Sequence, residues 1–568
     1  MSTSSHRCAR TTSPSVNTRA STPEESAARR GFTTLLENPM ETDVLVIGAG
    51  PVGLTAANLL ADQGIRVTLA ERNPGITDEP RAISITDESL RVMAEIGVLH
   101  KLLPEMLVGT GARYFGRKGQ LLAEMSSHHS RLGQPVKSQF DQPVLVALLL
   151  EAAQARSGID LRFGTEVRAV ANHPEHAEVE LVDANGAQRL RAKWVLACDG
   201  GRSPVRTQLG IPLEGSTQVE KWIVVDVLNT QGEPERFSRF HCNGVRPCVV
   251  VPGVKGRCRY EFMLLPGDDP ARVTTPEFII ELVAPYQRIV AADIRRAAVY
   301  VAQQRIAASF RRGRVLLAGD AAHLMPPFAG QGLNAGIRDA ANLAWKIAAH
   351  VRGQASEALI DSYQAERRPH AEQMVRLSHR IGKVVMSTHP LLTTLRDVAV
   401  VALGIVPPAK RWLVDMKFLK QPYFTTGCIV PPASDLPRAA ADLVGRALPQ
   451  PRVQRPNGER IALDKVLGSD WAILRFPKDA ALEIQRPAGR REGVVDLDGA
   501  FAALLGSGLT LLVRPDRYVA AASRAPDEQL ALQALAALIP ALPACLYGTG
   551  PQGDTQPRAS LAIQSRAS

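Results

Sequence analysis

Three glycine-rich turns hold most of the residues in this sequence that could bind a charged ligand. The first is Gly48-Ala49-Gly50-Pro51-Val52-Gly53, which follows an apolar run and precedes a helical pattern. In such a turn Gly48 permits a sharp bend, Gly50 lets the backbone approach a pyrophosphate, and Gly53 allows a helix to pack closely on a strand. The helix N-terminus adds positive potential for the phosphates. This turn predicts dinucleotide binding, and a plain glycine turn is the alternative.

An acidic residue follows at the spacing that nucleotide binding requires. Glu71 lies 18 residues after Gly53, at the end of the second apolar run, Ile65–Ala70. A carboxylate at this place can accept hydrogen bonds from the hydroxyl pair of a ribose. Glu71 therefore strengthens the prediction of a dinucleotide site.

The second turn is Cys198-Asp199-Gly200-Gly201-Arg202-Ser203, after a buried strand expected at Lys193–Ala197. Asp199 could face a ligand, or it could simply cap the helix that follows. The residues of this turn alone leave both readings open.

The third motif joins a strand, a carboxylate and another glycine turn. The strand Gly313–Ala318 delivers Asp320 to a loop, where its carboxylate can accept hydrogen bonds from a polyol chain. The turn Gly330-Gln331-Gly332-Leu333-Asn334 then opens a helix. The free N–H groups of that helix would face an electron-rich acceptor, such as the N1–C2=O edge of a flavin.

The motifs are flanked by apolar runs without alternation, and such runs predict strands that are buried on both faces. Such runs, with the helix between the first two, indicate a βαβ opening. Helical patterns fill residues 85–160 and continue to about 405 after the third motif, and alternation over roughly 215–305 predicts an inserted, mainly antiparallel sheet. A smaller third domain is expected at 430–550.

Composition narrows the class of protein. The 568 residues should form two or three folding units. The net charge of +11 is scattered, without zinc-finger spacing or an aromatic RNA-binding signature, so we expect no nucleic-acid partner and no metal site. A mild positive field favours anionic cofactors and a carboxylate substrate. Seven cysteines without a CxxC pair fit a reducing cytoplasm.

The N-terminal segment contains no apolar run typical of a secretory signal, and its Glu24, Glu25 and Glu37 argue against the alternative of an organelle transit peptide. Residues 1–39 are rich in Ser, Thr and Arg and are predicted to be a disordered extension, with Met40 as an alternative start. Charged residues interrupt the apolar stretch Val384–Val406, so no membrane span is expected.

In their order and distances the three motifs resemble the FAD-dependent aromatic hydroxylases of the para-hydroxybenzoate hydroxylase fold, the class A flavoprotein monooxygenases. The resemblance covers roughly residues 41–400. The sequences of three segments look most similar to the 3-(3-hydroxyphenyl)propionate hydroxylase branch: Asp320–His323, Asn342–Lys346 and Arg259–Gly267. The third domain, with Val513-Arg514-Pro515-Asp516, resembles the thioredoxin-like C-terminal domain of this subgroup and is expected to help assembly or stability.

This resemblance implies an α/β fold: a Rossmann-like FAD-binding monooxygenase domain over 41–405, an inserted substrate sheet, long helices and a thioredoxin-like α/β domain over 430–550. It implies that Glu71 binds the adenosine ribose, Arg72 or Arg81 lies near the AMP part, and Gln142 contacts the flavin. Asp199 would serve FAD and nicotinamide, and Asp320 the ribityl chain. The isoalloxazine would be lined by Gly330, Gln331, Gly332, Leu333 and Asn334. Ordinary surface or capping polarity is the alternative for Arg81 and Gln142.

The implied reaction has two halves. NADH or NADPH reduces FAD, and the reduced flavin takes up O₂ as a C4a-hydroperoxide that hydroxylates a phenolic acid ortho to its hydroxyl. The cofactor carries the chemistry while the protein orients the ring and excludes water. Candidates for the phenol-activating base are His323, Tyr260 and His241, each of which also reads as a structural residue. Arg246, Arg257 or Arg259 could hold a substrate carboxylate or could be solvated strand residues.

Other functions remain open on the same residues. The substrate could be a polyketide or a simple phenol instead of a 3-(3-hydroxyphenyl)propionate-like acid of aromatic catabolism. From another class, the chain could be a non-hydroxylating FAD-binding regulatory protein. The expected partners are a small phenolic substrate and O₂, and the assembly considered is a homodimer.

Overall fold

The computed structural model describes residues 39–547 apart from 127–130, 231, 233, 386, 415–420, 479–480 and 525–526. The extension predicted at residues 1–39 therefore lies, except for Pro39, outside the described residues. Of the helices in the described part, none combines the length and the apolarity that crossing a membrane would require.

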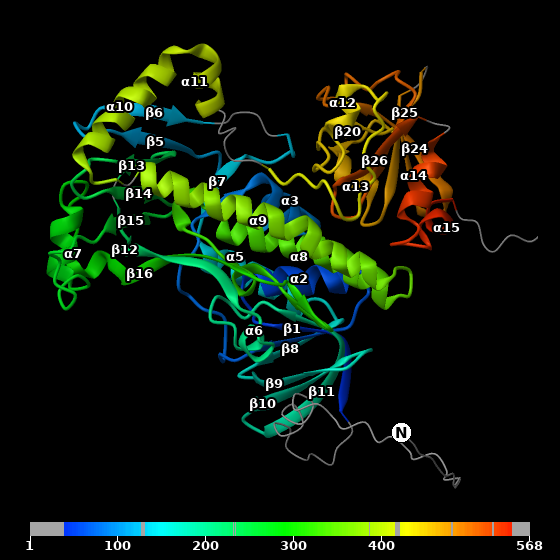
Figure 1. Ribbon diagram of the computed structural model, residues 1–568, viewed down its shortest axis with the longest axis horizontal. Helices are drawn as coiled ribbons and strands as arrows, with labels where there is room; N and C mark the ends of the chain where they lie inside the picture. The colour runs from blue at the N-terminus through cyan, green and yellow to red at the C-terminus, as the bar shows by residue number, and fades with distance from the viewer. Residues whose placement is uncertain are drawn as a thin grey trace, which may run out of the picture.

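A parallel sheet forms the base of the molecule (Figure 1). Its central strand β1 pairs in parallel with β2 and β11, and the sheet continues in parallel to β8 on one side and β18 on the other. These strands are β1 (Met40–Ile47), β2 (Val67–Glu71), β8 (Ile159–Phe163), β11 (Gly186–Ala197) and β18 (Val315–Leu317). Val44, Leu45 and Val46 have no exposed surface, as expected for a strand buried on both faces. The predicted Rossmann-like sheet is confirmed.

Further elements extend and cover this sheet. The antiparallel strands β9, β10 and β17 extend it, and α2 packs against α5 and α8 to cover a face. The short helix α6 follows β11. These elements are β9 (Glu166–Asn172), β10 (Ala177–Asp183), β17 (Arg311–Arg312), α2 (Pro51–Asp62), α5 (Gln142–Gln154), α6 (Pro204–Gln208) and α8 (Gly332–Val351).

A second eight-stranded sheet has the order β19-β16-β12-β15-β14-β13-β5-β6. Its pairings are antiparallel except that between β13 and β5. The strands are β5 (Gly111–Phe115), β6 (Leu121–Met125), β12 (Leu213–Val227), β13 (Phe237–His241), β14 (Cys248–Pro252), β15 (Cys258–Met263), β16 (Ile294–Ala307) and β19 (His323–Leu324). The mainly antiparallel sheet is confirmed, but it is larger than residues 215–305. The helical reading of residues 85–160 was wrong for β5 and β6, because β5 is held by pairing with β13, a segment far away in sequence, and β6 pairs with β5.

Small elements link the two sheets. A three-stranded sheet has the order β3-β7-β4 and is followed by α5. The linking elements are β3 (Ser84–Thr86), α3 (Asp87–Ile96), α4 (Leu99–Leu102), β4 (Met106–Leu107), β7 (Lys137–Phe140) and the 3-10 turns η3 (Gly319–Ala321) and η4 (Pro327–Ala329). The helix α7 (Pro276–Val283) covers the face of the second sheet that turns away from the first.

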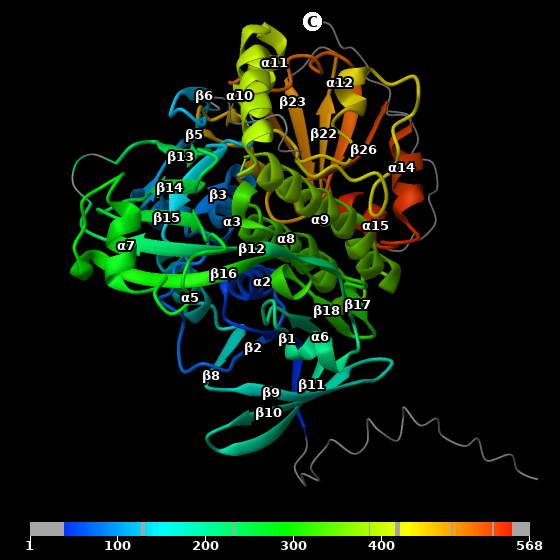
Figure 2. The same cartoon turned by 60° about the vertical axis from the view of Figure 1, so that its left-hand side comes forward.

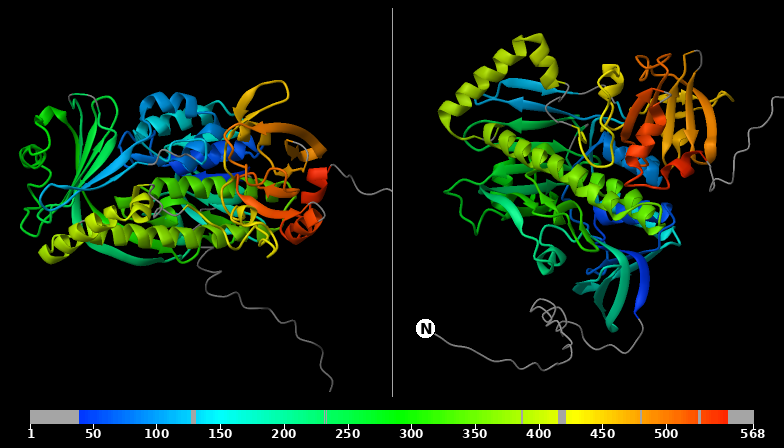
Figure 3. Two further views of the ribbon diagram at one scale, coloured as in Figure 1. Left: turned by 90° about the horizontal axis from the view of Figure 1, so that it is seen from above. Right: turned by 45° about the vertical axis from the view of Figure 1, so that its right-hand side comes forward.

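Long helices connect the second sheet to the C-terminal unit, residues 421–547. Figures 1 and 2 show α8 beside α9 (Glu357–Val385), running between the second sheet and that unit. Seen from above, in the left view of Figure 3, the two helices bridge the two ends of the molecule. Beyond α9, α10 (Pro390–Ile405) and α11 (Pro407–Val414) pack on β6.

The C-terminal unit has its own hydrophobic core around an antiparallel sheet of order β21-β20-β24-β23-β22-β25-β26. Its strands are β20 (Arg452–Gln454), β21 (Arg460–Ala462), β22 (Ala472–Phe476), β23 (Leu482–Arg486), β24 (Arg490–Asp496), β25 (Leu509–Val513) and β26 (Val519–Arg524). Its helices are α12 (Arg438–Ala441), α13 (Leu463–Leu467), α14 (Glu528–Leu535) and α15 (Leu542–Tyr547). Its predicted likeness to a thioredoxin-like domain stays a prediction.

Buried charges bind the C-terminal unit to the long helices. The carboxylate of Glu366 on α9 accepts hydrogen bonds from Arg514 at 2.9 Å, Lys346 at 2.8 Å and Asn342 at 2.7 Å. Burial alone would raise the pKa of Glu366, but Arg514 and Lys346 lower it to about 2. Arg514 extends the network to Asp516 at 2.5 Å. Because every charge has a partner, the burial of this cluster is tolerated.

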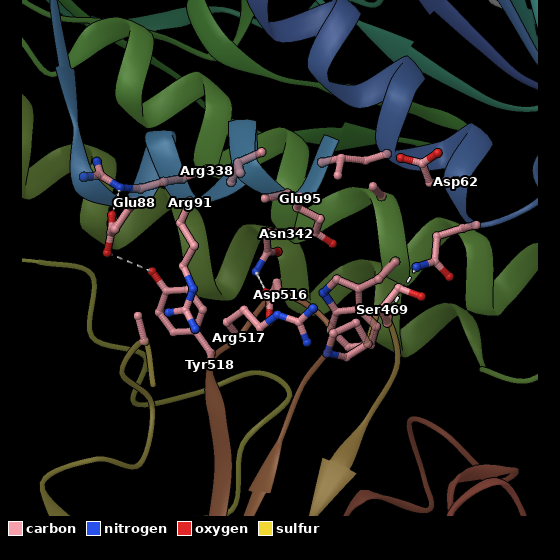
Figure 4. A pocket seen from close by; sticks show the side chains of 18 of the residues that line it. Asp62, Glu88, Arg91, Glu95, Arg338, Asn342, Ser469, Asp516, Arg517 and Tyr518 are labelled. Carbon is pink, nitrogen blue, oxygen red and sulfur yellow. Dashed lines mark hydrogen bonds and ion pairs between the residues drawn. The ribbon is translucent and has the colours of Figure 1, made fainter. Parts of the chain in front are cut away.

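A cavity of about 350 Å³ lies beside this cluster (Figure 4). Its walls come from α3, α8 and the turn between β25 and β26, with Arg91 and Asn342 facing Asp516 and Arg517 across it. Arg91 is already held by Asp464 through two hydrogen bonds of 2.6 and 2.7 Å. None of the residues of the three glycine-rich motifs lines this cavity.

Candidate functional site

The three motifs meet at the carboxyl ends of the parallel strands. Gly48 follows β1, Glu71 ends β2, Asp199 follows β11, and Asp320 follows β18. These four strands are neighbours in the sheet order β18-β11-β1-β2. In open α/β sheets this edge is where ligands bind.

The backbone of the first turn fits between its neighbours only with glycine. Gly48 has a φ of +102°, and a Cβ atom there would lie 2.6 Å from the carbonyl oxygen of Cys198. A Cβ atom on Gly53 would overlap the carbonyl oxygen of Gly48. Gly50 differs, because a Cβ atom there would meet nothing within 4 Å. Gly48 and Gly53 therefore set the packing, and Gly50 leaves the groove open for a ligand.

The carboxylate of Glu71 reaches this turn directly. Its Oε2 accepts a hydrogen bond from the backbone N–H of Ala49 at 2.8 Å. Its Oε1 accepts from the backbone and side-chain nitrogens of Asn73 at 3.0 and 2.6 Å. Glu71 thus lies beside the turn, in the wall of the groove.

Two connected cavities form the groove. The first, about 780 Å³, is lined by the first turn together with Glu71, Arg72 and Asp199. The second, about 340 Å³, is lined by Asp320 and the loop of Gly330, Gln331, Gly332 and Leu333. The two share Gly50, Pro51, Arg81, Gln142, Cys198 and Gly200 in their walls. Apart from Gly53 and Asn334, the predicted cofactor-binding residues line one or both cavities near Gly50.

The side chain of Gln142 points into the junction of the cavities. Its Oε1 accepts a hydrogen bond from the backbone N–H of Ala82 at 2.7 Å. Its Nε2 makes no hydrogen bond to the residues that the structure describes, so it is available to a ligand. Arg81 lines both cavities, with a side chain that is 69% exposed.

Asp199 is placed so that both readings left open by the sequence remain possible. Its Oδ2 accepts hydrogen bonds from Ser203 Oγ at 2.7 Å and from the backbone N–H of Val205 at 3.2 Å, at the start of α6. Its Oδ1 is buried without a partner, and Asp199 lines the groove. Burial raises the pKa of Asp199, against the lowering effect of the Ser203 hydrogen bond. Burial also raises the pKa of Asp320 at the other end of the groove, with His323 and Arg81 opposing it.

The N-terminus of α8 faces the second cavity. Gly332 begins the helix, and no side chain caps it. Its first-turn N–H groups have no partner within the helix and can donate to an electron-rich ligand. Asn334, in contrast, is fully buried, with its amide bonded to Ser84, Thr86, Ser89 and Gly330. It holds the loop in place and does not line the cavity.

His323 does not reach the cavity. It is fully buried, and its Nε2 lies 2.7 Å from Asp339 Oδ2. The same Oδ2 accepts from the backbone N–H of Gly319 at 3.0 Å. The candidate role of His323 as the phenol-activating base is therefore corrected: its place is that of a residue that positions the Asp320 turn.

Tyr260 and His241 are corrected for a different reason, the alternation of side chains along a strand. On β15, Arg259 and Glu261 face the second cavity, so Tyr260 faces α7, where its hydroxyl donates to Gln287 at 2.8 Å. On β13, Phe240 faces the cavity, so His241 turns away and packs against Tyr286, with the two rings tilted by 57°. Neither ring can touch a ligand in the groove.

The three arginines considered for a substrate carboxylate are all engaged elsewhere. Arg246 binds Asp268 through two hydrogen bonds of 2.7 Å, and Arg257 forms an ion pair with Asp141. Arg259 lines the cavity, but its Nε donates to Asp226 at 2.6 Å and its other nitrogens bond to Asp226 and to the carbonyl oxygens of residues 80–81. Arg259 thus fixes the loop that carries Arg81.

Two charged residues of the second cavity were missed by sequence reasoning. Glu261 and Lys137 both line it. Strand alternation could have indicated Glu261 once the cavity-facing side of the sheet was known. Lys137 lies in the region read as helical, so no sequence signal placed it.

The groove fits an extended dinucleotide that carries a flavin. It begins at the glycine turn and Glu71, passes the empty space at Gly50, and ends at the helix N-terminus of α8 beside Asp320. The donors and acceptors along it match, in order, a ribose, a pyrophosphate, a ribityl chain and the N1–C2=O edge of an isoalloxazine. The residues present therefore fit FAD.

Comparisons with known proteins agree with this geometry. A family model described as "FAD binding domain" matches residues 41–378, and one described as "HcaD C-terminal domain" matches residues 445–489. A 3-(3-hydroxy-phenyl)propionate/3-hydroxycinnamic acid hydroxylase of Mycolicibacterium smegmatis is 35% identical over 534 residues, which covers 88% of this chain and 94% of that protein. A protein of the same name from Comamonas testosteroni is 34% identical and covers 85% and 94%.

Solved structures share the architecture. The aklavinone-11 hydroxylase in its ternary complex with FAD and aklavinone has a TM-score of 0.69 and 26% identity, covering 88% of this chain and 99% of that one. The flavin-dependent monooxygenase PieE, in complex with FAD and substrate, has a TM-score of 0.71 at 21% identity, with the same coverage. The latter similarity bears on the fold alone.

The contrast between Gly50 and Gly53 gives a test of the cofactor site. G50A adds a methyl group to the open groove and not to a protein contact, so we expect a protein that folds but retains several-fold less FAD. G53A adds its methyl group against the Gly48 carbonyl, so we expect loss of folded protein. The measurements are the FAD-to-protein absorbance ratio and the thermal melting of the apo form. Normal FAD content in a folded G50A variant would contradict this assignment of the groove.

Proposed function

Because the chain belongs to the FAD-dependent aromatic hydroxylases, the class A flavoprotein monooxygenases, we propose that it hydroxylates a phenolic aromatic acid similar to 3-(3-hydroxyphenyl)propionate, ortho to its hydroxyl. The observation that carries the proposal is the 35% identity, over 88% of the chain, with a relative named for that substrate. FAD is the cofactor of the family, and NAD(P)H is its typical reductant. The chemistry that FAD supplies when bound is acceptance of hydride and, once reduced, activation of O₂.

The second cavity offers an apolar wall for an aromatic ring. Phe240, Val249 and Val251 face it from β13 and β14, and Phe328 faces it from η4. Phe328 also packs edge-on against Trp222 of β12, with ring centroids 5.3 Å apart. A substrate ring between this wall and the loop at Gly330 would be shielded from water, which favours hydroxylation over loss of the activated oxygen.

Glu261 is the residue that we propose for accepting the phenol proton. It lines the cavity from β15 and is only 8% exposed. Burial raises the pKa of Glu261, although Arg259 lowers it, so its carboxylate is a stronger base than one in water.

An apolar helix face supports the homodimer. On α10 the polar side chains of Thr393, Arg396 and Asp397 are buried, and Asp397 accepts from the backbone N–H of Arg117 at 2.8 Å. The large apolar side chains point outward instead, and they include Leu391, Leu392, Leu395, Val398, Val401, Leu403 and Ile405. A face of this kind on a stable protein indicates a contact surface. We infer that a second copy covers it.

A cytoplasmic location also stays part of this proposal, supported by the six described cysteines, which are all free thiols.

Turnover tests the function directly. We expect the purified, FAD-loaded enzyme to oxidise NADH or NADPH several-fold faster when 3-(3-hydroxyphenyl)propionate is present, and to form the 2,3-dihydroxy product. Reductant consumption is followed by absorbance and the product by chromatography. Stimulation by a polyketide or a simple phenol, but by no phenolic acid, would replace the proposed substrate. Bound FAD with no stimulation by any phenol would reject the hydroxylation of phenols by this chain.

Loss of the proposed base should affect the chemical step. We expect E261Q to bind FAD and substrate but to lower kcat by about 10²–10⁴-fold, the usual contribution of a general base. In the unchanged enzyme, kcat should fall as the pH drops through the raised pKa of Glu261, because protonation removes the base. E220Q, on the exposed part of β12, is the control. An unchanged pH profile of kcat in E261Q would exclude this role.

The oligomeric state can be measured with the α10 face altered. We expect a dimer mass for the unchanged protein by light scattering after size exclusion. The double substitution L395E and V398E should give monomers, because it places charges in the apolar contact. A monomeric unchanged protein would contradict the dimer.

A further inference from the structure

Lys137 brings a positive charge into the second cavity. It begins β7 and lines the same cavity as Glu261 and the loop at Gly330. Two residues further on the same strand, Gln139 Nε2 donates to Ser238 Oγ at 2.7 Å. Since alternate residues of a strand share a face, this bond turns the Lys137 side of β7 toward the cavity-facing side of the second sheet.

The other cations of that cavity are either bonded to protein groups or exposed to solvent. Arg259 donates from all of its side-chain nitrogens to Asp226 and to residues 80–81. Arg81 lies at the junction with the first cavity, 3.9 Å from Glu79 and largely exposed to solvent. Lys137 differs from both, because its ammonium makes no ion pair or hydrogen bond with any residue in the described part of the chain.

An unpaired ammonium in such a place is costly. Lys137 is half-buried, and burial lowers its pKa to about 8. Buried charges in proteins are normally paired, so a charge without a partner in a ligand cavity indicates that a ligand supplies the partner. At neutral pH the group is still mostly protonated and can bind an anion.

We propose that the ammonium of Lys137 binds the carboxylate of the aromatic acid and so selects acids over neutral phenols. This inference rests on the proposed function and names the residue that sets its substrate class. Glu261 and Asp320, which line the same cavity, repel a carboxylate. The acid group is therefore directed to Lys137, and the phenol hydroxyl is left to Glu261.

The test compares an acid with its neutral isostere on the FAD-loaded, full-length enzyme. The two ligands are 3-(3-hydroxyphenyl)propionate and 3-(3-hydroxyphenyl)propanamide, and the variants are K137M, K137R and, as a surface control, K118M. We expect K137M to raise the KM and the Kd of the acid at least tenfold and to leave those of the amide within twofold. K137R should keep most of the affinity for the acid, and K118M should match the unchanged enzyme.

The pH dependence gives a second readout. Lys137 loses its proton above pH 8, so the Kd of the acid for the unchanged enzyme should rise there, whereas the Kd of the amide should not. K137M should abolish this rise. Because the pKa of Lys137 is lower in the folded than in the unfolded protein, its charge opposes folding at pH 7, and K137M should melt at a higher temperature.

Several results would overturn the proposal. Equal weakening of the acid and the amide, or a shifted flavin absorption spectrum in K137M, would mean that Lys137 acts on the cofactor or the fold. A lower melting temperature for K137M would mean that the ammonium is paired in the free enzyme. Binding is measured without NADH, so a failure of hydroxylation itself shows separately, as tight acid binding without turnover.

Discussion

The carboxylate of Asp339 is the interaction on which the arrangement of the groove depends. It is fully buried on α8 and accepts hydrogen bonds from the backbone N–H of Gly319 at 3.0 Å, from His323 at 2.7 Å and from Arg367 at 2.8 Å. Burial alone would raise the pKa of Asp339, but His323 and Arg367 lower it. The carboxylate therefore stays charged, and one side chain fixes the Asp320 turn relative to the helix whose N-terminus faces the flavin site.

The two long helices α8 and α9 also hold buried ion pairs that connect the groove region to the C-terminal unit. Arg367 lies next to Glu366 on α9, and Glu366 holds Lys346 of α8 and Arg514 of the C-terminal unit. The buried charges thus form adjacent clusters along one helix pair, from the cofactor loop to the C-terminal unit. Removing one member of a buried cluster leaves its partners unpaired, which typically costs 3–5 kcal/mol, roughly half of a typical domain's stability. That the C-terminal unit stabilises the rest of the chain in this way stays a prediction.

The cofactor-binding edge of the parallel sheet could be predicted from local sequence motifs. The residues of the second cavity could not, because their positions depend on strand pairing between segments far apart in sequence. Gly50, Glu71 and Asp320 stand at strand ends, so their convergence follows from the strand order of a βαβ fold. The base candidates Tyr260 and His241 were wrong because alternation gives two faces but does not tell which face the first sheet covers. Lys137 could not be placed either, since its strand is defined by pairing with β3 and β4 and not by its own pattern.

Oxygen labelling during turnover shows whether the chain inserts an atom of O₂ into the aromatic ring. The FAD-loaded enzyme is supplied with NADH or NADPH, ¹⁸O₂ and 3-(3-hydroxyphenyl)propionate, and the mass of the product is measured by mass spectrometry. We expect one ¹⁸O atom in a dihydroxy product, because the new ring oxygen comes from O₂ in a cavity that excludes water. A dihydroxy product whose new oxygen comes from water, or labelled hydrogen peroxide with no hydroxylated product, would contradict this expectation.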